Sequence, residues 1–142
     1  MYRFAPLLQK NATLEDPSRV IVTGSISGIG LGPVLTENAA PAYSASKAAV
    51  LHLARNLAVE LGPRHILVNG LAPGFFPTKM ADGIIGAGGG EAKQAALSPN
   101  GRLGRPEDVA AAVVYLCSRG AGHVNGDTIA LDGGRLLAGS VL

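Results

Sequence analysis

Apolar residues between Ala42 and Leu61 recur at a spacing that places them on one face of an α-helix. The stripe consists of Ala49, Leu53, Leu57 and Leu61 at steps of four, widened by Val50 and Ala54. Gly62 and Pro63 follow directly, and these two residue types end helices. The pattern therefore predicts a long helix over 42–61 whose stripe faces the core.

Three short apolar runs predict buried parallel strands, which lie at Arg19 to Thr23, Ile66 to Val68 and Thr128 to Leu131. Further helices are predicted over 2–12, with Phe4, Leu7 and Leu8 on one side, and from Arg105 to about Ser118. The second of these has Pro106 at its first position and acidic residues in its first turn. Strands that alternate with helices predict one α/β domain with a parallel sheet.

The segments between these elements contain many glycines and prolines. Residues 24–41 are predicted to form a loop, and Asn69 to Thr78 a fixed irregular loop at the carboxyl end of the second strand. Ligands of open α/β sheets gather at such strand ends. Residues 79–101 include three consecutive glycines and no sustained period, so we expect a mobile segment, and residues 135–142 form a tail.

The composition of the 142 residues is that of a globular protein, with 47% hydrophobic and 15% charged residues. The net charge is only +2, and no basic run with interleaved aromatic residues suggests nucleic-acid binding. No stretch has the length and hydrophobicity of a signal peptide or a membrane span, so we expect a soluble, cytoplasmic protein. The single Cys117 is expected to be a small core residue, and the three scattered histidines predict no metal site.

The most informative pair is Tyr43 and Lys47, which lie one turn apart on the same face of the predicted helix. A tyrosine ordinarily ionises near pH ~10, and a fixed cation nearby favours the phenolate. A tyrosine with such a neighbour can act as a general acid or base. The spacing alone is also common on solvated helices, so the interpretation depends on the surrounding motifs.

Those motifs are Val20 to Gly28 (VIVTGSISG), Tyr43 to Lys47 (YSASK), Val68 to Thr78 (VNGLAPGFFPT), Gly101 to Val109 (GRLGRPEDV) and Gly126 to Gly134 (GDTIALDGG). In this order they resemble the C-terminal half of a short-chain dehydrogenase/reductase, and the downstream motifs are similar to those of 3-oxoacyl carrier-protein reductases. The resemblance implies a Rossmann-like, doubly wound parallel sheet of which only the second half, with three strands, is present. It also places residues 79–101 where the family has its substrate lid.

The resemblance implies a catalytic trio of Ser25, Tyr43 and Lys47. Tyr43 would be the acid/base, and Lys47 would stabilise its phenolate and bond the nicotinamide ribose. The hydroxyl of Ser25 would bond the substrate oxygen, which gains negative charge as hydride arrives at the carbon. Ser27 is the alternative to Ser25 in this role.

Further matches imply contacts with the cofactor, which would be NADP or NAD with a slight preference for NADP. Pro73, Gly74 and Thr78 match the family's loop against the nicotinamide ring and its carboxamide. Asn69 is interpreted as a structural residue at the end of its strand. The chain contains no counterpart of the family's first half, with its Gly-rich phosphate-binding turn, so its contacts would be confined to the nicotinamide end.

An alternative assignment of residues 23–30 (TGSISGIG) is the Gly-rich fingerprint itself, since this stretch also follows an apolar strand. That assignment requires a helix directly afterwards, whereas Pro33 and residues 38–41 indicate a loop. Tyr43 also follows Ser25 at the distance that suits the serine strand. The serine assignment is therefore favoured.

The sequence leaves three interpretations of function. The leading one is an oxidoreductase that acts on a small-molecule carbonyl or secondary alcohol, as a homo-oligomer. The second is a non-catalytic remnant or interaction subunit that pairs with a full-length relative, because the strand at Val20 to Thr23 would expose an edge and an apolar face. The third is that the sequence is part of a longer protein.

Overall fold

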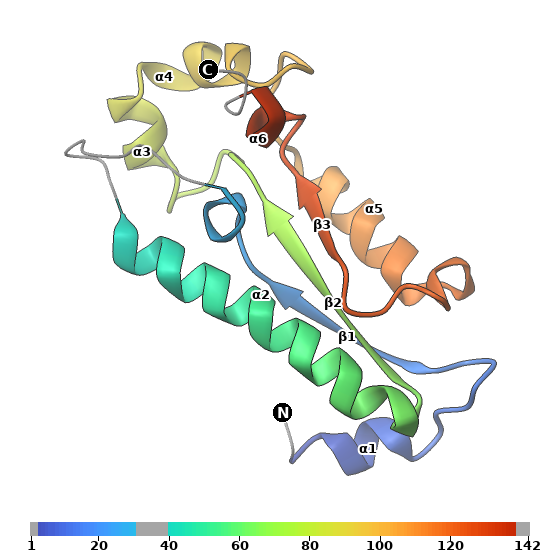
Figure 1. The fold of residues 1–142 in the computed structure, drawn as a ribbon. Helices are drawn as coiled ribbons and strands as arrows, with labels where there is room; N and C mark the ends of the chain where they lie inside the picture. Colours follow the sequence, from blue (N-terminus) through green and yellow to red (C-terminus); the bar gives the residue numbers. More distant parts are fainter. Residues whose placement is uncertain (1–2, 31–39, 139–142) are drawn as a thin grey trace.

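The computed structural model describes residues 3–30 and 40–138 (Figure 1). Its helices and strands, with η marking 3-10 helices, are in chain order α1 (Ala5–Gln9), β1 (Ser18–Thr23), η1 (Ile26–Gly28), α2 (Pro41–Leu61), η2 (Gly62–Arg64), β2 (Ile66–Pro73), α3 (Asp82–Ala87), α4 (Gly90–Ala96), α5 (Pro106–Cys117), η3 (Arg119–Ala121), β3 (Thr128–Leu131) and α6 (Arg135–Ala138). The part of the predicted 24–41 loop that covers 31–39, including Pro33 and Asn38, lies outside the described residues.

The three strands form a parallel sheet with β2 in the centre. Ser18 and Thr23 of β1 pair with Ile66 and Leu71 on one side of β2, and Thr128 of β3 pairs with Gly70 on the other. The helix α2 covers one face of the sheet and α5 the other (Figure 1). The predicted α/β fold with three parallel strands alternating with helices is therefore confirmed.

The core on one face is formed by α2, which begins and ends close to the predicted bounds. Its buried residues are Leu51, Ala54, Leu57, Ala58 and Leu61. The predicted stripe is wrong at its N-terminal end, because Ala49 is exposed and Leu53 is 52% exposed. A row at steps of four rotates by about 40° around the helix at each step, so it leaves the buried face after two steps. Leu51 and Ala58 are buried in place of Ala49 and Leu53.

On the opposite face, α5 packs Val109, Val113 and Leu116 against Ile129 of β3. The predicted bounds of this helix, with Pro106 at its first position, are confirmed. The prediction that Cys117 is a core residue is wrong, since its side chain is exposed. Successive helical residues point about 100° apart, and the neighbouring Leu116, 1% exposed, takes the position that faces the sheet.

The central strand β2 continues to Pro73, where the sequence predicted an irregular loop from Asn69. Pairing on both sides explains the difference, because β3 pairs with Gly70 to Pro73. A Cβ atom at Gly70 would lie 2.8 Å from Oγ1 of Thr128 and 2.9 Å from Cδ2 of Leu51. Glycine is therefore needed here for close packing rather than for a turn.

Asn69 is buried within β2, only 3% exposed, and uses both ends of its amide. Its Nδ2 donates to the carbonyl oxygen of Val124 at 2.8 Å, and its Oδ1 accepts from the backbone N–H of Asp127 at 3.1 Å. These bonds attach β2 to the segment that leads into β3. They agree with the structural role predicted for this residue.

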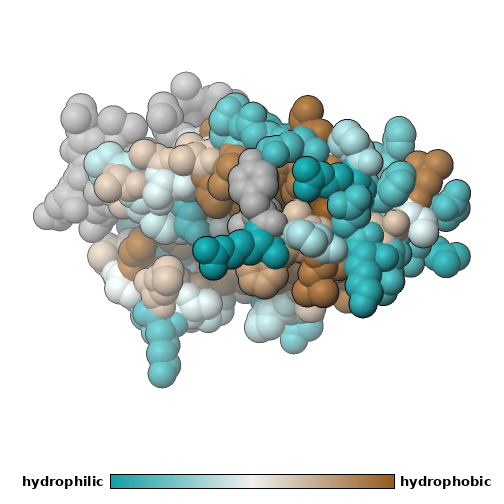
Figure 2. Space-filling view, turned by 90° about the horizontal axis from the view of Figure 1, so that it is seen from below, coloured by the Kyte–Doolittle hydropathy of each residue, from teal (hydrophilic) through white to brown (hydrophobic). Residues whose placement is uncertain are grey.

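The ends of the chain and the glycine-rich segment contain short helices. The helix predicted over 2–12 is shortened to α1. Of the residues predicted on its apolar side, Leu8 packs against the core, whereas Phe4 and Leu7 are 64% and 70% exposed. Figure 2, which views the molecule from the end where α1 lies, shows hydrophobic side chains at the surface among hydrophilic ones. Residues 79–101 contain the short helices α3 and α4, and the predicted tail begins with α6.

The start of α5 is fixed by an ion pair between Arg102 and Asp108. The guanidinium donates to both carboxylate oxygens, at 2.6 and 2.9 Å. One of these oxygens also accepts from the backbone N–H of Arg105 at 2.8 Å, which caps the helix. The hydrogen bond from Arg102, followed by that from Arg105, lowers the pKa of the Asp108 carboxyl from 3.8 to about 2.

We expect Asn69→Ala to destabilise the chain by about 1–3 kcal/mol, because it removes the buried amide and leaves the part-buried N–H of Asp127 and carbonyl of Val124 without their partners. Urea unfolding followed by circular dichroism measures this. The matched control is Asn56→Ala on α2, whose exposed side chain bonds only the carbonyl of His52. Its effect should stay within about 0.5 kcal/mol. Equal losses for the two variants would contradict the structural role of Asn69.

We expect the Arg102–Asp108 pair to contribute to stability above pH ~4 and to lose its contribution as the pH falls toward ~2. Stability falls on acidification because the pKa of Asp108 is lower in the folded chain, so the unfolded chain takes up a proton first. The melting temperature of Asp108→Asn should therefore converge on that of the unaltered chain between these pH values. Glu107→Gln, in the same helical turn, is the control, and a constant gap across this range would refute the assignment.

Candidate active site

The first candidate, Ser25, lies directly beyond the carboxyl end of β1. The backbone N–H of Gly24 donates to the carbonyl oxygen of Leu71 at 2.7 Å, which continues the pairing with β2. Ser25 is in an extended conformation, is 8% exposed, and caps η1 by accepting a bond from the N–H of Ser27 at 3.2 Å. The serine hydroxyl is thus held at the strand end by backbone bonds.

The short helix η1 packs against the backbone of α2. A Cβ atom at Gly28 would lie 2.5 Å from the carbonyl carbon of Lys47, a distance that no side chain tolerates. At Gly24 a Cβ would lie 2.5 Å from Cδ2 of Leu51. The two glycines therefore allow the segment that carries Ser25 to lie directly on the turns of α2 that carry the other candidates.

Tyr43 and Lys47 project from the first turns of α2. The Nζ of Lys47 lies 5.6 Å from the centroid of the Tyr43 ring, close enough for a cation–π contact. The same Nζ donates to the carbonyl oxygen of Thr23 at 3.3 Å. Tyr43 is 41% exposed. Lys47 is thus the side chain that joins Tyr43 to the end of the strand that leads into Ser25.

The predicted cofactor loop leaves the sheet at the neighbouring strand end. Pro73 is the last residue of β2, and the N–H of Gly74 donates to the carbonyl oxygen of Leu131 at 3.0 Å. A Cβ at Gly74 would approach Cβ of Asp132 to 2.9 Å, so glycine permits this close approach to the end of β3. The exposed Thr78 accepts from the N–H of Ala81 through Oγ1 at 3.3 Å, at the start of α3.

The alternative assignment of residues 23–30 requires a helix whose N-terminus cradles a phosphate. Between β1 and Gly30, where the described stretch ends, the structure has the three-residue η1, whose Ser25 cap already bonds the N–H of Ser27. A single 3-10 turn has neither the aligned N–H groups nor the dipole of an α-helix. The geometry therefore favours the serine assignment.

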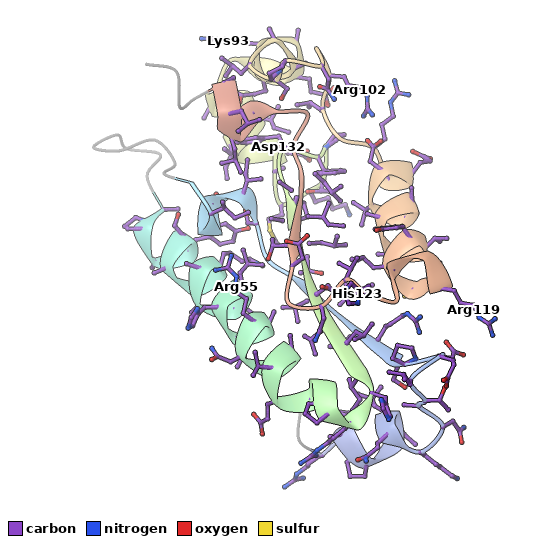
Figure 3. The ribbon with its side chains drawn as sticks, turned by 45° about the vertical axis from the view of Figure 1, so that its right-hand side comes forward. Arg55, Lys93, Arg102, Arg119, His123 and Asp132 are labelled. Carbon is purple, nitrogen blue, oxygen red and sulfur yellow. The ribbon has the colours of Figure 1, made fainter. Side chains whose placement is uncertain are left out.

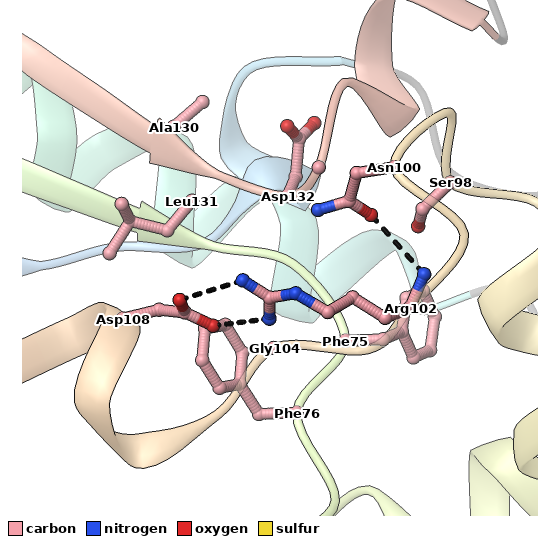
Figure 4. A pocket seen from close by; sticks show the side chains of 11 residues that line it. Phe75, Phe76, Ser98, Asn100, Arg102, Gly104, Asp108, Ala130, Leu131 and Asp132 are labelled. Carbon is pink, nitrogen blue, oxygen red and sulfur yellow. Dashed lines mark hydrogen bonds and ion pairs between the residues drawn. The ribbon is translucent and has the colours of Figure 1, made fainter.

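A cavity of about 210 Å³ lies behind the cofactor loop, between the end of β3 and the start of α5 (Figure 4). It is lined by Phe75, Phe76, Ser98, Asn100, Arg102, Gly104, Asp108, Ala130, Leu131, Asp132 and Gly133. None of Ser25, Tyr43 and Lys47 borders it. The Arg102–Asp108 pair fills part of its wall, and the ring of Phe76 packs against Gly104. The cavity is therefore separate from the three predicted catalytic residues.

Sequence reasoning noted the Gly101 to Val109 motif without giving it a role. Its Gly104 donates to the carbonyl oxygen of Phe75 at 2.9 Å, so this motif holds the cofactor loop from behind. Figure 3 shows Arg102 and Asp132 toward the same end of the molecule as Lys93, whereas Arg119 lies at the far end of α5. Gly104 was the available signal, because a glycine permits close contact between segments and a Cβ at this position would meet the ring of Phe76.

Within residues 3–30 and 40–138, no helix combines the length and the hydrophobicity that a membrane crossing requires. The same ranges contain no gathering of three or more His, Cys, Asp or Glu side chains that could hold a metal ion.

Comparison with known proteins gives concordant matches. A family model described as Enoyl-(Acyl carrier protein) reductase matches residues 2–135. The rhamnolipids biosynthesis 3-oxoacyl-(acyl-carrier-protein) reductase of Pseudomonas aeruginosa is 42% identical over 129 residues, which are 91% of this chain and 49% of that protein.

Solved structures agree with this result. The Pseudomonas aeruginosa RhlG/NADP active-site complex matches with a TM-score of 0.83 and 40% identity, over 94% of this chain and 51% of that one. A short chain dehydrogenase from Leptospira borgpetersenii with bound NAD+ matches with a TM-score of 0.75 and 25% identity, over 93% and 48%. The chain spans about half the length of these relatives. The match over residues 2–135, together with the shared fold, shows that the chain belongs to the short-chain dehydrogenase/reductase family.

Proposed function

We propose that this chain carries the nicotinamide side of an oxidoreductase that transfers a hydride between NAD(P)(H) and a carbonyl or secondary alcohol. The observation that carries the proposal is the position of Lys47, which contacts the Tyr43 ring and bonds the carbonyl of Thr23 just before Ser25. A base, a cation and a hydroxyl thus border one strand end. Related structures that contain NADP and NAD+ support a nicotinamide cofactor.

In the direction of reduction, the carbonyl carbon accepts the hydride that a bound nicotinamide supplies, and negative charge develops on the carbonyl oxygen. The Oγ of Ser25 accepts its bond from Ser27 through a lone pair, so its proton is available to donate to that oxygen. The phenol of Tyr43 then transfers its proton to the oxygen and completes the alcohol. The ammonium of Lys47 stabilises the resulting phenolate and has two further protons beyond the bond to Thr23.

The cofactor contacts proposed for this chain are those of the nicotinamide end. Pro73, Gly74 and Thr78 would hold the ring and its carboxamide, and Lys47 the ribose. The residues fit such a ligand because the loop after β2 and the half-exposed Tyr43 both lie beyond the carboxyl ends of the strands. We propose NADP ahead of NAD, and a carbonyl substrate of the class that the name of the Pseudomonas aeruginosa relative indicates, a 3-oxoacyl group.

A second candidate function is that of an interaction subunit that pairs with a full-length relative or with a second copy. Two observations favour it: β1 pairs on one side only within the described sheet, and Leu53 and Val59 of α2 are 52% and 81% exposed. Apolar side chains on one helix and an unpaired strand edge both bind other chains readily.

For the catalytic proposal, Tyr43→Phe should lower turnover of a 3-oxoacyl thioester with NADPH by at least about 10²-fold, because it removes the transferable proton. The far-ultraviolet circular dichroism spectrum should be unchanged. Tyr115→Phe, on the similarly exposed face of α5, is the matched control and should retain full activity. Turnover by Tyr43→Phe equal to that of the control would refute the role of Tyr43.

For the interaction proposal, the chain should co-elute in size-exclusion chromatography with the full-length Pseudomonas aeruginosa reductase. Leu53→Asp should abolish the complex, because it places a charge within the proposed apolar contact. Leu7→Asp, on α1, is the control. Elution of the unaltered chain as a monomer, separate from the reductase, would exclude this function.

A further inference from the structure

Arg135, the first residue of α6, contacts two segments that are far apart in the sequence. Its guanidinium stacks on the ring of Phe75 at 4.2 Å, in the loop that follows β2. Its two terminal nitrogens donate to Gln94 of α4, to the backbone oxygen at 3.0 Å and to Oε1 at 2.8 Å. One side chain therefore joins the predicted cofactor loop to the segment at 79–101.

The position of Arg135 is fixed by the N-terminal turn of α6. The carboxylate of Asp132 accepts from the N–H groups of Gly134 and Leu136 at 2.9 and 2.8 Å. Leu136 packs against the cluster of Ile26, Leu51 and Ala72, which places α6 on the turn that follows Ser25. Burial lowers the pKa of Arg135, and Asp132 acts in the opposite direction. The guanidinium is thus partly desolvated on a rigid support.

Gln94 is the contact of Arg135 in α4, and it is 6% exposed. Its Nε2 donates to the carbonyl oxygen of Gly88 at 2.8 Å, directly after α3. Among the described residues, the three hydrophobic clusters contain no member of α3 or α4. The bonds of Gln94 therefore connect α4 to the end of α3 and to α6, and α3 adds the buried side chain of Ile85.

We propose that Arg135 is a positioning residue that couples the α3–α4 segment to the loop carrying Pro73, Gly74 and Phe75. A guanidinium suits this task because its planar face stacks on a ring while its edge donates two parallel bonds. A lysine ammonium can stack or donate, but it cannot reproduce the fork. The catalytic meaning of this coupling rests on the proposed function. Under that function, the segment over the substrate and the loop along the nicotinamide take up their positions together.

The coupling is tested first without any cofactor, by limited trypsin digestion of the 142-residue chain. Cleavage after the exposed Lys93 of α4 reports release of that helix, and cleavage after Arg19, which lies within β1 with its side chain 10% exposed, reports global opening. Arg135→Gln should accelerate cleavage after Lys93 by about tenfold, and Arg135→Lys by less. Arg119→Gln, an exposed arginine beyond α5, should have no effect.

A pair of loop variants separates coupling from simple attachment of α4. Phe75→Leu removes the stacked ring and should accelerate cleavage after Lys93 by about threefold, although the change lies in the other segment. The ring of Phe76 packs against Gly104 instead, so Phe76→Leu should leave that rate unchanged. Cleavage after Arg19 should be constant throughout. Equal rates after Lys93 for Phe75→Leu and Phe76→Leu, or for Arg135→Gln and Arg119→Gln, would overturn the proposal.

Steady-state kinetics then test the catalytic meaning of the coupling. Arg135→Gln should raise KM for both NADPH and the carbonyl substrate with a smaller change in kcat, and Arg135→Lys should recover part of the loss. A fall in kcat alone would contradict a positioning role. Absence of turnover in the unaltered chain would count against the proposed function, while the digestion rates would still decide whether Arg135 couples the two segments.

Discussion

The contact between Gly28 and the backbone of Lys47 is the constraint on which the candidate site depends. A Cβ at Gly28 would come within 2.5 Å of the carbonyl carbon of Lys47, so glycine at this position lets η1 lie directly on α2. That contact sets the distance between the strand end that carries Ser25 and the helix that carries Tyr43 and Lys47. The bond from Lys47 to Thr23 then bridges the two elements with a charge. The close backbone packing at Gly28 is therefore what brings the candidate side chains together.

The same edge of the sheet is assembled from backbone contacts between neighbouring strand ends. Gly74 bonds Leu131, Gly104 bonds Phe75 and Asn100 bonds Gly133, each through a backbone N–H. These bonds lock the loop after β2 between the end of β3 and the approach to α5. The polar side chains that remain, above all the Arg102–Asp108 pair and Arg135, fix the segments that surround this edge. Under the proposed function, this loop is the part of the chain that would hold the nicotinamide ring.

Much of this architecture follows from the sequence, because β-branched runs and helix caps are local signals. β1, β3 and α5 occur close to their predicted bounds, and the end of α2 at Leu61 follows from Gly62 and Pro63. The failures have tertiary causes. Pairing on both sides extends β2 through Gly70 to Pro73. The orientation of α5 on the sheet exposes Cys117 and buries Leu116. The contacts of Arg135 join residues 41 positions apart along the chain, which no local pattern reveals.

The most direct test of the account is a titration of the 142-residue chain with NADPH, followed by the fluorescence of the nicotinamide. If Lys47 and the loop after β2 form a nicotinamide site, binding is saturable, and Lys47→Met weakens it by about tenfold through loss of a charged hydrogen bond. A chain that is folded by circular dichroism and gives no saturable signal would contradict the account. So would equal affinities of the unaltered chain and Lys47→Met.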